Sequence, residues 1–295
     1  MLREHGIALI VVLWMLTLLA IIAGSFTYTL RIESTLAVNV VGRAKARALA
    51  EAGIAYAALD MLRPPPLRRF PPNGIPYPWK FGTETVMISV RDVAGLIDLN
   101  TASRELLGGL LMAAGVPANG QGRLLDAIED WRDPDDIPLL EGAEDKDYFA
   151  AGLPYGAKDG PFDDVTELQQ VLGISSALYQ RMAPSLTVYS GQAGVDPTVA
   201  PREVLLAIPG VDLQLIEAYL EERRIMAARG DIPPPLPPIG GGYLAQASGL
   251  AYSVRAEAKP EEGGAAVIEA VIALGSSGTG GFIPNSSILQ WRENL

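Results

Sequence analysis

Charged residues are absent from a long apolar stretch near the start of the chain, between Ile7 and Leu30. At about 1.5 Å per residue, a helix of this length spans roughly 36 Å, enough to cross the hydrocarbon core of a membrane. Arg31 and Glu33 lead directly into more helical sequence, whereas a secretory signal peptide has a shorter apolar core followed by a cleavage site of small residues. The pattern predicts a retained transmembrane segment at residues 7–30.

The helical pattern continues beyond the apolar stretch. Between Arg31 and Leu62, alanine, leucine and valine recur at helical spacing among charged residues, as in an amphipathic helix. Pro64, Pro65 and Pro66 have no amide hydrogen to donate, so the helix should end near Arg63. A proline-rich connector is then expected up to Trp79.

Strand patterns lie at both ends of the remaining chain. Alternation and β-branched residues predict strands at Thr83–Val93, Leu250–Lys259, Ala265–Leu274 and Ile283–Arg292. Between the first and second of them, Asn100–Ala228 is helical in pattern, and residues 230–242 form a proline- and glycine-rich linker. This order predicts an α+β fold in which a long N-terminal helix lies on a small antiparallel sheet interrupted by a helical insert. The predicted divisions are 1–6 (leader), 7–30 (membrane span), 31–99 (helix and first strand), 100–242 (insert) and 243–295 (last strands).

The predicted insert contains an internal repeat. Each copy reads as helix, glycine turn, helix, because glycine permits backbone conformations that a side chain opposes. The matching residues are Asp98, Ala102, Arg104, Glu105 and Leu107 with Asp196, Ala200, Arg202, Glu203 and Leu205, followed by Gly115-Val116 and Gly210-Val211; a shorter copy has Glu167-Leu168 and Gly173-Ile174.

The repeat around Ile208–Val211 resembles the helix-hairpin-helix module, which binds DNA phosphates through backbone amides. Here Asp212 stands where that module has its second glycine, and an aspartate repels phosphate. The net charge of -11 is also unfavourable for nucleic acid. We therefore expect a packed helical module and no nucleic-acid partner, with a membrane-anchored DNA-binding protein of the competence type as the alternative.

Composition excludes several kinds of chemistry. The chain has no cysteine and a single histidine, His5, so disulfides, thiolate sites, histidine-ligated metals and a serine-histidine-carboxylate triad are excluded. There is no phosphate-binding Gly-Lys-Ser/Thr motif and no nucleophile elbow. We expect a protein that is not an enzyme.

The densest acidic stretch runs from Asp126 to Asp147. It is not an EF-hand, because Ile137 and Pro138 occupy positions that need a ligand and a glycine. The stretch can be a solvated surface or a calcium-binding loop of another kind, since calcium takes several carboxylate and carbonyl oxygens. The candidate ligands are Asp130, Asp133, Asp135, Asp136, Glu144 and Asp145.

The first six residues form a short charged leader that ends in Gly6 and is followed at once by the apolar run from Ile7. One interpretation is an uncleaved signal anchor with Arg3 on the cytoplasmic side. The other is a prepilin-like leader, which prepilin peptidase cuts after Gly6 before Ile7 is methylated.

Several short motifs occur in the same order as in a known family. They are the leader and long helix with residues 43–54, Ile97–Ala102, Asp130–Asp133, Gly142–Asp145 and Leu186–Ser190. Together they resemble the K-type minor pseudopilin of the type II secretion system. This resemblance implies an inner-membrane protein with one span and a periplasmic C-terminal domain, located at the tip of the pseudopilus. It also implies I-type and J-type minor pseudopilins as partners, and calcium in the helical domain.

The resemblance makes Val11 informative, because it is the fifth residue after the expected cleavage site. Pilins usually have glutamate there, and a carboxylate in the bilayer is costly unless a partner such as a neighbouring terminal ammonium compensates it. A subunit at the tip has no neighbour above it to provide that charge. Valine therefore fits a tip subunit, with a minor pilin of an ordinary type IV pilus as a further alternative.

Overall fold

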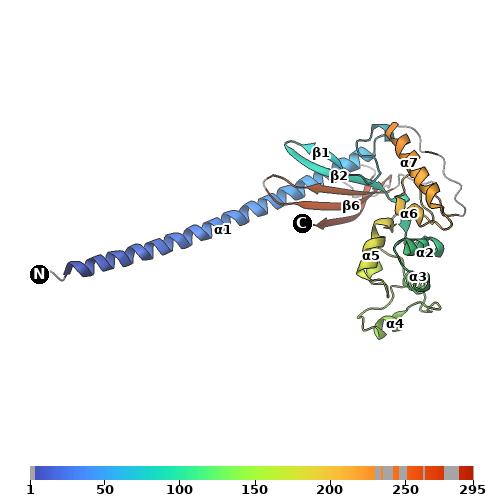
Figure 1. The fold of residues 1–295 in the computed structure, drawn as a ribbon, viewed down its shortest axis with the longest axis horizontal. Helices are drawn as coiled ribbons and strands as arrows, with labels where there is room; N and C mark the ends of the chain where they lie inside the picture. The colour runs from blue at the N-terminus through green and yellow to red at the C-terminus, as the bar shows by residue number, and fades with distance from the viewer. Residues whose placement is uncertain are drawn as a thin grey trace.

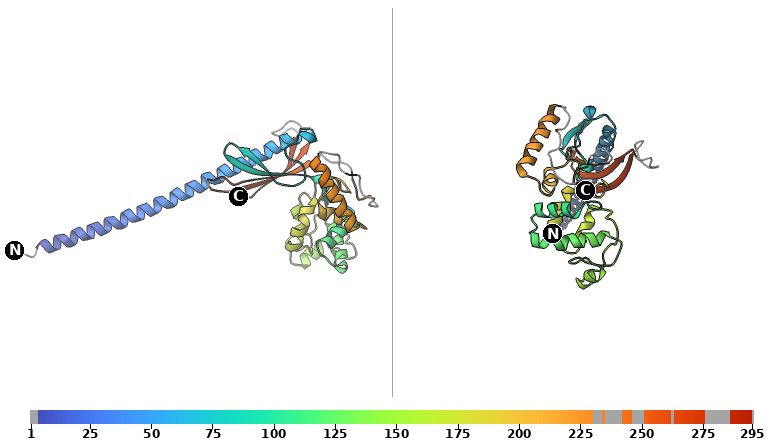
Figure 2. Two further views of the ribbon diagram at one scale, coloured as in Figure 1. Left: turned by 45° about the horizontal axis from the view of Figure 1, so that its top comes forward. Right: turned by 90° about the vertical axis from the view of Figure 1, so that its right-hand side faces the viewer.

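The structure is a computed structural model of the chain, and it describes residues 4–229, 234, 242–245, 251–261, 263–275 and 286–294. One helix, α1 (Glu4–Met61), projects as a long rod from a body made of a sheet and shorter helices (Figure 1). The sheet lies along the last part of α1, and the shorter helices lie at the end of the molecule opposite the N-terminus (Figures 1 and 2). The predicted α+β class is confirmed.

Helix α1 has two parts that differ in burial. The described side chains from Leu9 to Val41 are exposed, whereas Ala46 and the residues after it contribute a buried face to the sheet. That face is built mainly from alanine, so the helix axis comes close to the strands. Just before this face, Gly42 meets the turn at Gly263, where a Cβ atom on Gly42 would stand 2.8 Å from the carbonyl carbon of Gly263.

The end of α1 agrees with its prediction to within two residues. The last helical residue is Met61, followed by the 3₁₀ turn η1 (Pro65–Leu67). The buried carboxylate of Asp60 fixes the chain beyond the helix, because its Oδ2 accepts hydrogen bonds from the amides of Arg69 (2.7 Å) and Phe70 (2.9 Å).

The sheet contains five antiparallel strands in the order β1-β2-β5-β6-β7. Their bounds are β1 Tyr77–Phe81, β2 Glu84–Asp92, β5 Ala251–Ala258, β6 Ala266–Leu274 and β7 Ser286–Asn294. The four predicted strands are confirmed, although Leu250 of the second one and residues 283–285 of the last one lie outside the described residues. The connector predicted up to Trp79 is wrong in its last part, because β1 begins at Tyr77.

One face of this sheet packs on α1 and forms the first core. Val90 pairs with Val254, which pairs with Ala270, and all three are buried in this layer. Trp79 of β1 stacks on Tyr56 of α1, with ring centroids 4.9 Å apart. The long helix is thus held by apolar contacts across the width of the sheet.

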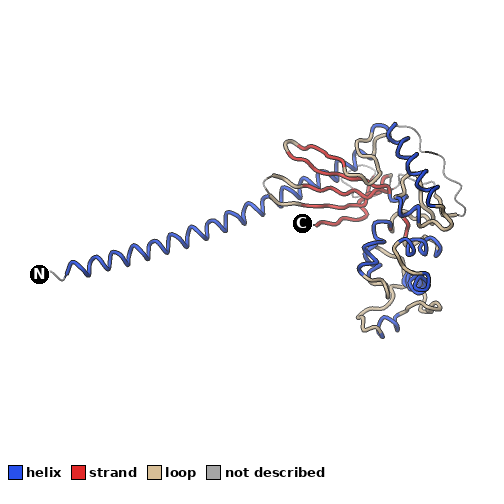
Figure 3. Tube along the Cα trace, viewed as in Figure 1, coloured by secondary structure: helices blue, strands red, loops and turns tan. Residues whose placement is uncertain are grey.

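The insert between β2 and β5 has its own core, which includes Leu106, Ile128 and Met182. Its elements are η2 Val93–Gly95, β3 Ile97–Asp98, α2 Arg104–Ala113, α3 Ala118–Arg132, α4 Asp145–Ala150, η3 Val165–Gln169, α5 Ser176–Met182, η4 Ala183–Ser185, β4 Leu186–Thr187, α6 Arg202–Leu206 and α7 Leu213–Arg229. Figure 3 shows that long loops separate these helices. The helical insert is confirmed, while its limits at residues 100 and 242 stay predictions.

Glycine turns join the repeated helices as predicted. Gly115 lies between α2 and α3, Gly173 between η3 and α5, and Gly210 between α6 and α7, with φ of 85°, 92° and 74°. These angles lie in the left-handed region that glycine enters without strain. The third copy differs from its prediction in one respect, because its first helix is the 3₁₀ turn η3.

Candidate metal centre

Two buried carboxylates of α3 hold the acidic loop that follows it. Asp130 accepts backbone hydrogen bonds from Leu139 (3.2 Å) and Ala143 (2.8 Å), and Asp126 accepts one from Glu141 (3.0 Å). Gly142 passes so close to Asp130 that a Cβ atom there would overlap its carboxylate. The loop from residue 133 to residue 144 is therefore folded back against α3.

This folding brings together three carboxylates that are distant in the sequence. Oxygen atoms of Asp136, Glu144 and Asp159 all lie within 4.8 Å of one another. Asp136 and Asp159 are exposed, whereas Glu144 is only 4% exposed. Asp159 has φ of 53°, the left-handed conformation that aspartate tolerates better than most side chains but that still costs free energy.

Glu144 lies at the bottom of this cluster without compensation from the described part of the chain. Both of its carboxylate oxygens are buried and accept no hydrogen bond there, and the same holds for Oδ1 of Asp133. Burial, together with the charges of Asp130, Asp159, Asp133 and Asp136, raises the pKa of Glu144 from 4.5 to about 7. A buried carboxylate with unsatisfied oxygens needs a proton or a cation.

The pKa values of two neighbouring acids are also raised. Burial and the charge of Asp136 raise the pKa of Asp159, and burial with the charges of Asp135 and Glu129 raises that of Asp133. The carboxylates thus destabilise one another's ionised forms. Their oxygen atoms are hard donors, and the spacing is one that a cation such as calcium, with oxygen contacts at about 2.3–2.6 Å, can bridge.

The six predicted ligands have different environments. Asp136 and Glu144 lie in the cluster, and Asp133 contributes an unpartnered oxygen to the same loop. Asp130 is buried and accepts hydrogen bonds from backbone amides. Asp135 is exposed and accepts a hydrogen bond from the amide of Ile137 (2.9 Å). Asp145 is exposed and is the first residue of α4.

Asp159 belongs to the cluster but was not among the predicted ligands. It lies outside the acidic stretch, in the sequence Lys-Asp-Gly-Pro. Asp-Gly is a turn signal, which indicates a loop but not the partner of that loop.

Stability without divalent cations is expected to depend on pH through Glu144. Its folded-state pKa lies above the unfolded value, so the native state binds the extra proton, and stability must fall as pH rises from 4.5 through about 7. The expected loss is on the order of 3 kcal/mol. Thermal unfolding in chelator between pH 4.5 and 8 measures it. Stability that rises with pH over this range would contradict the assignment.

The N-terminal sites lie in the exposed part of α1. The helix begins at Glu4, so Gly6 and Ile7 fall in its first turns, and Val11 is 51% exposed. By length and composition, this helix is the one candidate for a membrane span among the described residues. Cleavage after Gly6, methylation of Ile7 and the role of Val11 stay predictions.

At the helix-hairpin-helix-like turn after Gly210, the side chain of Asp212 takes up a backbone amide that would otherwise be available to phosphate. Asp212 accepts a hydrogen bond from the amide of Leu215 (3.0 Å) at the start of α7. Two arginines of the helices that flank this turn are paired with carboxylates, Arg202 with Glu217 and Arg224 with Glu221. These contacts give no support to the DNA-binding alternative.

Comparison with known proteins gives a consistent result. A family model described as "Type II secretion system (T2SS), protein K" matches residues 90–191. The type II secretion system protein K of Klebsiella pneumoniae is 30% identical over 253 residues, which cover 77% of this chain and 76% of that protein. The corresponding protein of Dickeya chrysanthemi is 31% identical over 120 residues, covering 39% of this chain and 33% of the relative.

A solved structure shares the fold. The chain is similar to one from the GspK-GspI-GspJ complex of the enterotoxigenic Escherichia coli type 2 secretion system, with a TM-score of 0.58 and 16% identity. The similarity covers 85% of this chain and 94% of that one. Sequence and fold agree over most of the molecule, and the chain belongs to the type II secretion system protein K family.

Proposed function

We propose that this protein is a minor pseudopilin at the tip of the type II secretion pseudopilus, where it acts in filament assembly and in export of folded proteins across the outer membrane. The observation that carries this proposal is α1, whose first part is apolar and exposed while its last part is covered by a sheet. A free apolar rod of this kind needs a membrane or neighbouring helices to cover it.

The partners proposed for this rod are I-type and J-type minor pseudopilins. Support comes from the shared fold with the chain from the GspK-GspI-GspJ complex. The proposed location is the inner membrane, with a single span at residues 7–30 and the C-terminal domain in the periplasm. Val11 fits the tip position, because it leaves no buried carboxylate that a further subunit would have to compensate.

We also propose that the acidic cluster binds calcium. The residues that would hold the ion are Asp136, Glu144 and Asp159, with Asp133 next to them because one of its oxygens is buried and unpartnered among the described groups. Asp130, Asp135 and Asp145 complete the proposed set as neighbours that shape the loop or add negative charge. A bound cation would replace the missing proton on Glu144 and fix the loop against α3.

Replacement of Gly6 tests the pilin-type processing. We expect Gly6→Leu to block cleavage by prepilin peptidase, so that the chain keeps residues 1–6, stays in the inner membrane and no longer supports secretion. Mass spectrometry of the membrane-extracted protein should show an unprocessed chain, whereas the unsubstituted protein should begin at N-methylated Ile7.

Gly24→Leu is the matched control. It makes the same change in α1, at a position where a Cβ atom would have no neighbour within 4 Å. The control should be processed like the unsubstituted protein. Normal trimming of Gly6→Leu would refute the proposed leader, even if secretion were impaired for another reason.

A further inference from the structure

A short segment connects the acidic cluster to the sheet of the other core. It runs from Asp159 to Asp164, and we call these six residues the linking segment. Its first residue belongs to the cluster with Asp136 and Glu144. Its last residue bonds with Gln290 and Arg292 of the edge strand β7. The two ends are five residues apart, so a displacement of one end is limited by the other.

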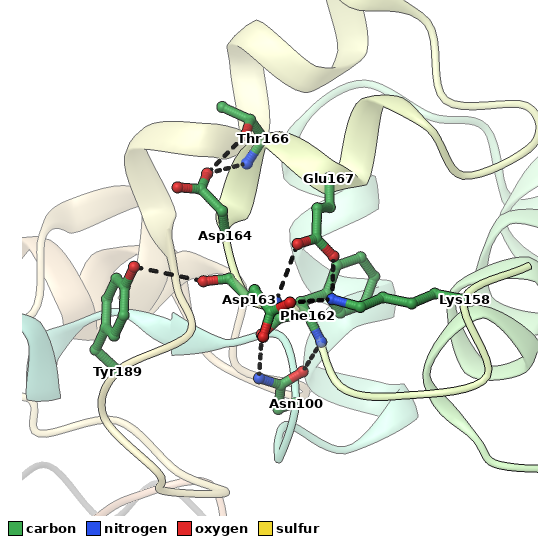
Figure 4. A network of polar contacts seen from close by, with 8 residues as sticks. All are labelled: Asn100, Lys158, Phe162, Asp163, Asp164, Thr166, Glu167 and Tyr189. Atoms are coloured by element: carbon green, nitrogen blue, oxygen red, sulfur yellow. Dashed lines mark hydrogen bonds and ion pairs between the residues drawn. The ribbon is translucent and has the colours of Figure 1, made fainter. Parts of the chain in front are cut away.

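The middle of the linking segment contacts Asn100 and helix α3. The amide and carbonyl of Phe162 bond with the side chain of Asn100 at 2.7 and 2.9 Å, as Figure 4 shows. The ring of Phe162 stacks on Trp131, with centroids 6.2 Å apart, and Trp131 belongs to the same helix as Asp130. The segment is therefore attached to the helix that positions the acidic loop.

Ion pairs and a helix cap fix the second half of the segment. Lys158 contacts Asp163 at 2.8 Å and Glu167 at 2.7 Å. Asp164 also accepts bonds from the amide and the hydroxyl of Thr166, each at 2.7 Å, which caps η3 (Figure 4). One carboxylate thus joins η3 of the insert to β7 of the sheet.

The contact of Asp164 with β7 is polar. A cavity of about 400 Å³ is lined by residues of both parts, including Tyr179 and Tyr189 of the insert and Arg255, Gln290 and Arg292 of the sheet. The two large apolar cores are separate, and a small third cluster, in which Val93 of the insert packs on Ala251 and Val271, joins the insert to β5 and β6 but includes no residue of β7. The position of Asp164 therefore matters for how firmly the insert holds the edge strand.

We propose that a cation at Asp136, Glu144 and Asp159 tightens the contact of Asp164 with β7, so that occupancy of the acidic cluster stiffens the edge of the pilin-like sheet. This inference rests on the proposed cation site. Without a cation, Asp159 lies within 4.8 Å of the carboxylates of Asp136 and Glu144 and has a left-handed φ of 53°, and both features raise the free energy of its position in the cluster. A bound cation reverses the sign of that interaction and holds the start of the linking segment.

Hydrogen exchange of the full chain in detergent tests the coupling. Exchange of the β7 amides, residues 286–294, is measured in calcium and in chelator, together with the melting temperature. We expect calcium to slow β7 exchange by about tenfold in the unsubstituted protein. In Asp164→Asn and in Arg292→Gln the slowing should be mostly lost, while the calcium-dependent rise in melting temperature remains.

Glu222→Gln is the control, because it removes one charge from an exposed residue of α7 that lies outside the linking segment and outside the acidic cluster. It should keep both the slowing and the thermal shift. A calcium-dependent thermal shift without any change in β7 exchange would refute the coupling but not the cation site. Undiminished slowing of β7 exchange in Asp164→Asn would have the same meaning. If calcium changes neither quantity, both the cation site and the coupling are refuted.

Discussion

Replacement of Glu144 by glutamine is expected to change stability in opposite directions with and without calcium. In chelator at pH 8, Glu144→Gln should be more stable than the unsubstituted protein by about 1–2 kcal/mol, because it removes a buried charge that its neighbours repel. In calcium the order should reverse. Excess calcium at about a hundred times its dissociation constant adds roughly 2.7 kcal/mol to a protein that binds it only when folded.

The measurement is thermal unfolding of the full chain in detergent, in calcium and in chelator. The calcium-dependent shift, roughly 5–10 °C in the unsubstituted protein, should mostly vanish in Glu144→Gln. Asp133→Ala combined with Glu144→Ala should have the same effect on the shift. Glu222→Gln is the control, since it removes the same charge from an exposed position of α7. Identical melting curves in calcium and chelator for the unsubstituted protein would show that the cluster is only a solvated surface.

The sequence predicted the acidic region but only part of the cluster. Composition could identify a dense run of carboxylates, and two of its members, Asp136 and Glu144, do meet. It could not show that Asp130 would be used by the amides of Leu139 and Ala143, because this depends on how the loop folds back. Asp159 was missed for the same reason, since a tertiary contact brings it to the loop.

The elements of the fold were predicted well where the spacing of apolar residues or the position of proline determines the local structure. The end of α1 follows from Pro64–Pro66, and β5 and β6 follow from alternation. Strand β1 was missed because Pro78 lies inside it, which argues against a central strand. The structure places β1 at the edge of the sheet, where proline is tolerated, and the stacking of Trp79 on Tyr56 provides contacts that no local pattern shows.

The repeat predicted helix-turn-helix units but not how closely they pack. Two of them meet where α2 crosses α6; of the two adjacent glycines in the middle of α2, Gly108 and Gly109, Gly109 makes this contact. A Cβ atom at Gly109 would overlap the carbonyl oxygen of Ala207 and stand 2.8 Å from its carbonyl carbon. At Gly108 it would touch only Cδ1 of Leu125, at 3.5 Å, an ordinary contact.

These neighbouring glycines should respond to the same substitution with opposite signs. Gly109→Ala is expected to destabilise the insert by about 3 kcal/mol, because the backbone of Ala207, at the C-terminal end of α6, cannot move aside as a flexible side chain can. Gly108→Ala should stabilise it by up to about 1 kcal/mol, since alanine favours the helix and has room here. Urea unfolding of the two variants, followed by circular dichroism, measures both changes.

Because the two variants have the same composition and lie in the same turn of the same helix, each is the control for the other. Helix propensity alone would make both stabilising, so a loss in Gly109→Ala alone identifies the crossing with α6 as the cause. Equal stabilisation by both substitutions would mean that α2 and α6 do not approach as closely as the structure shows. The helix-turn-helix pairing would then need larger side chains at its contact, and the glycine at 109 would have no packing role.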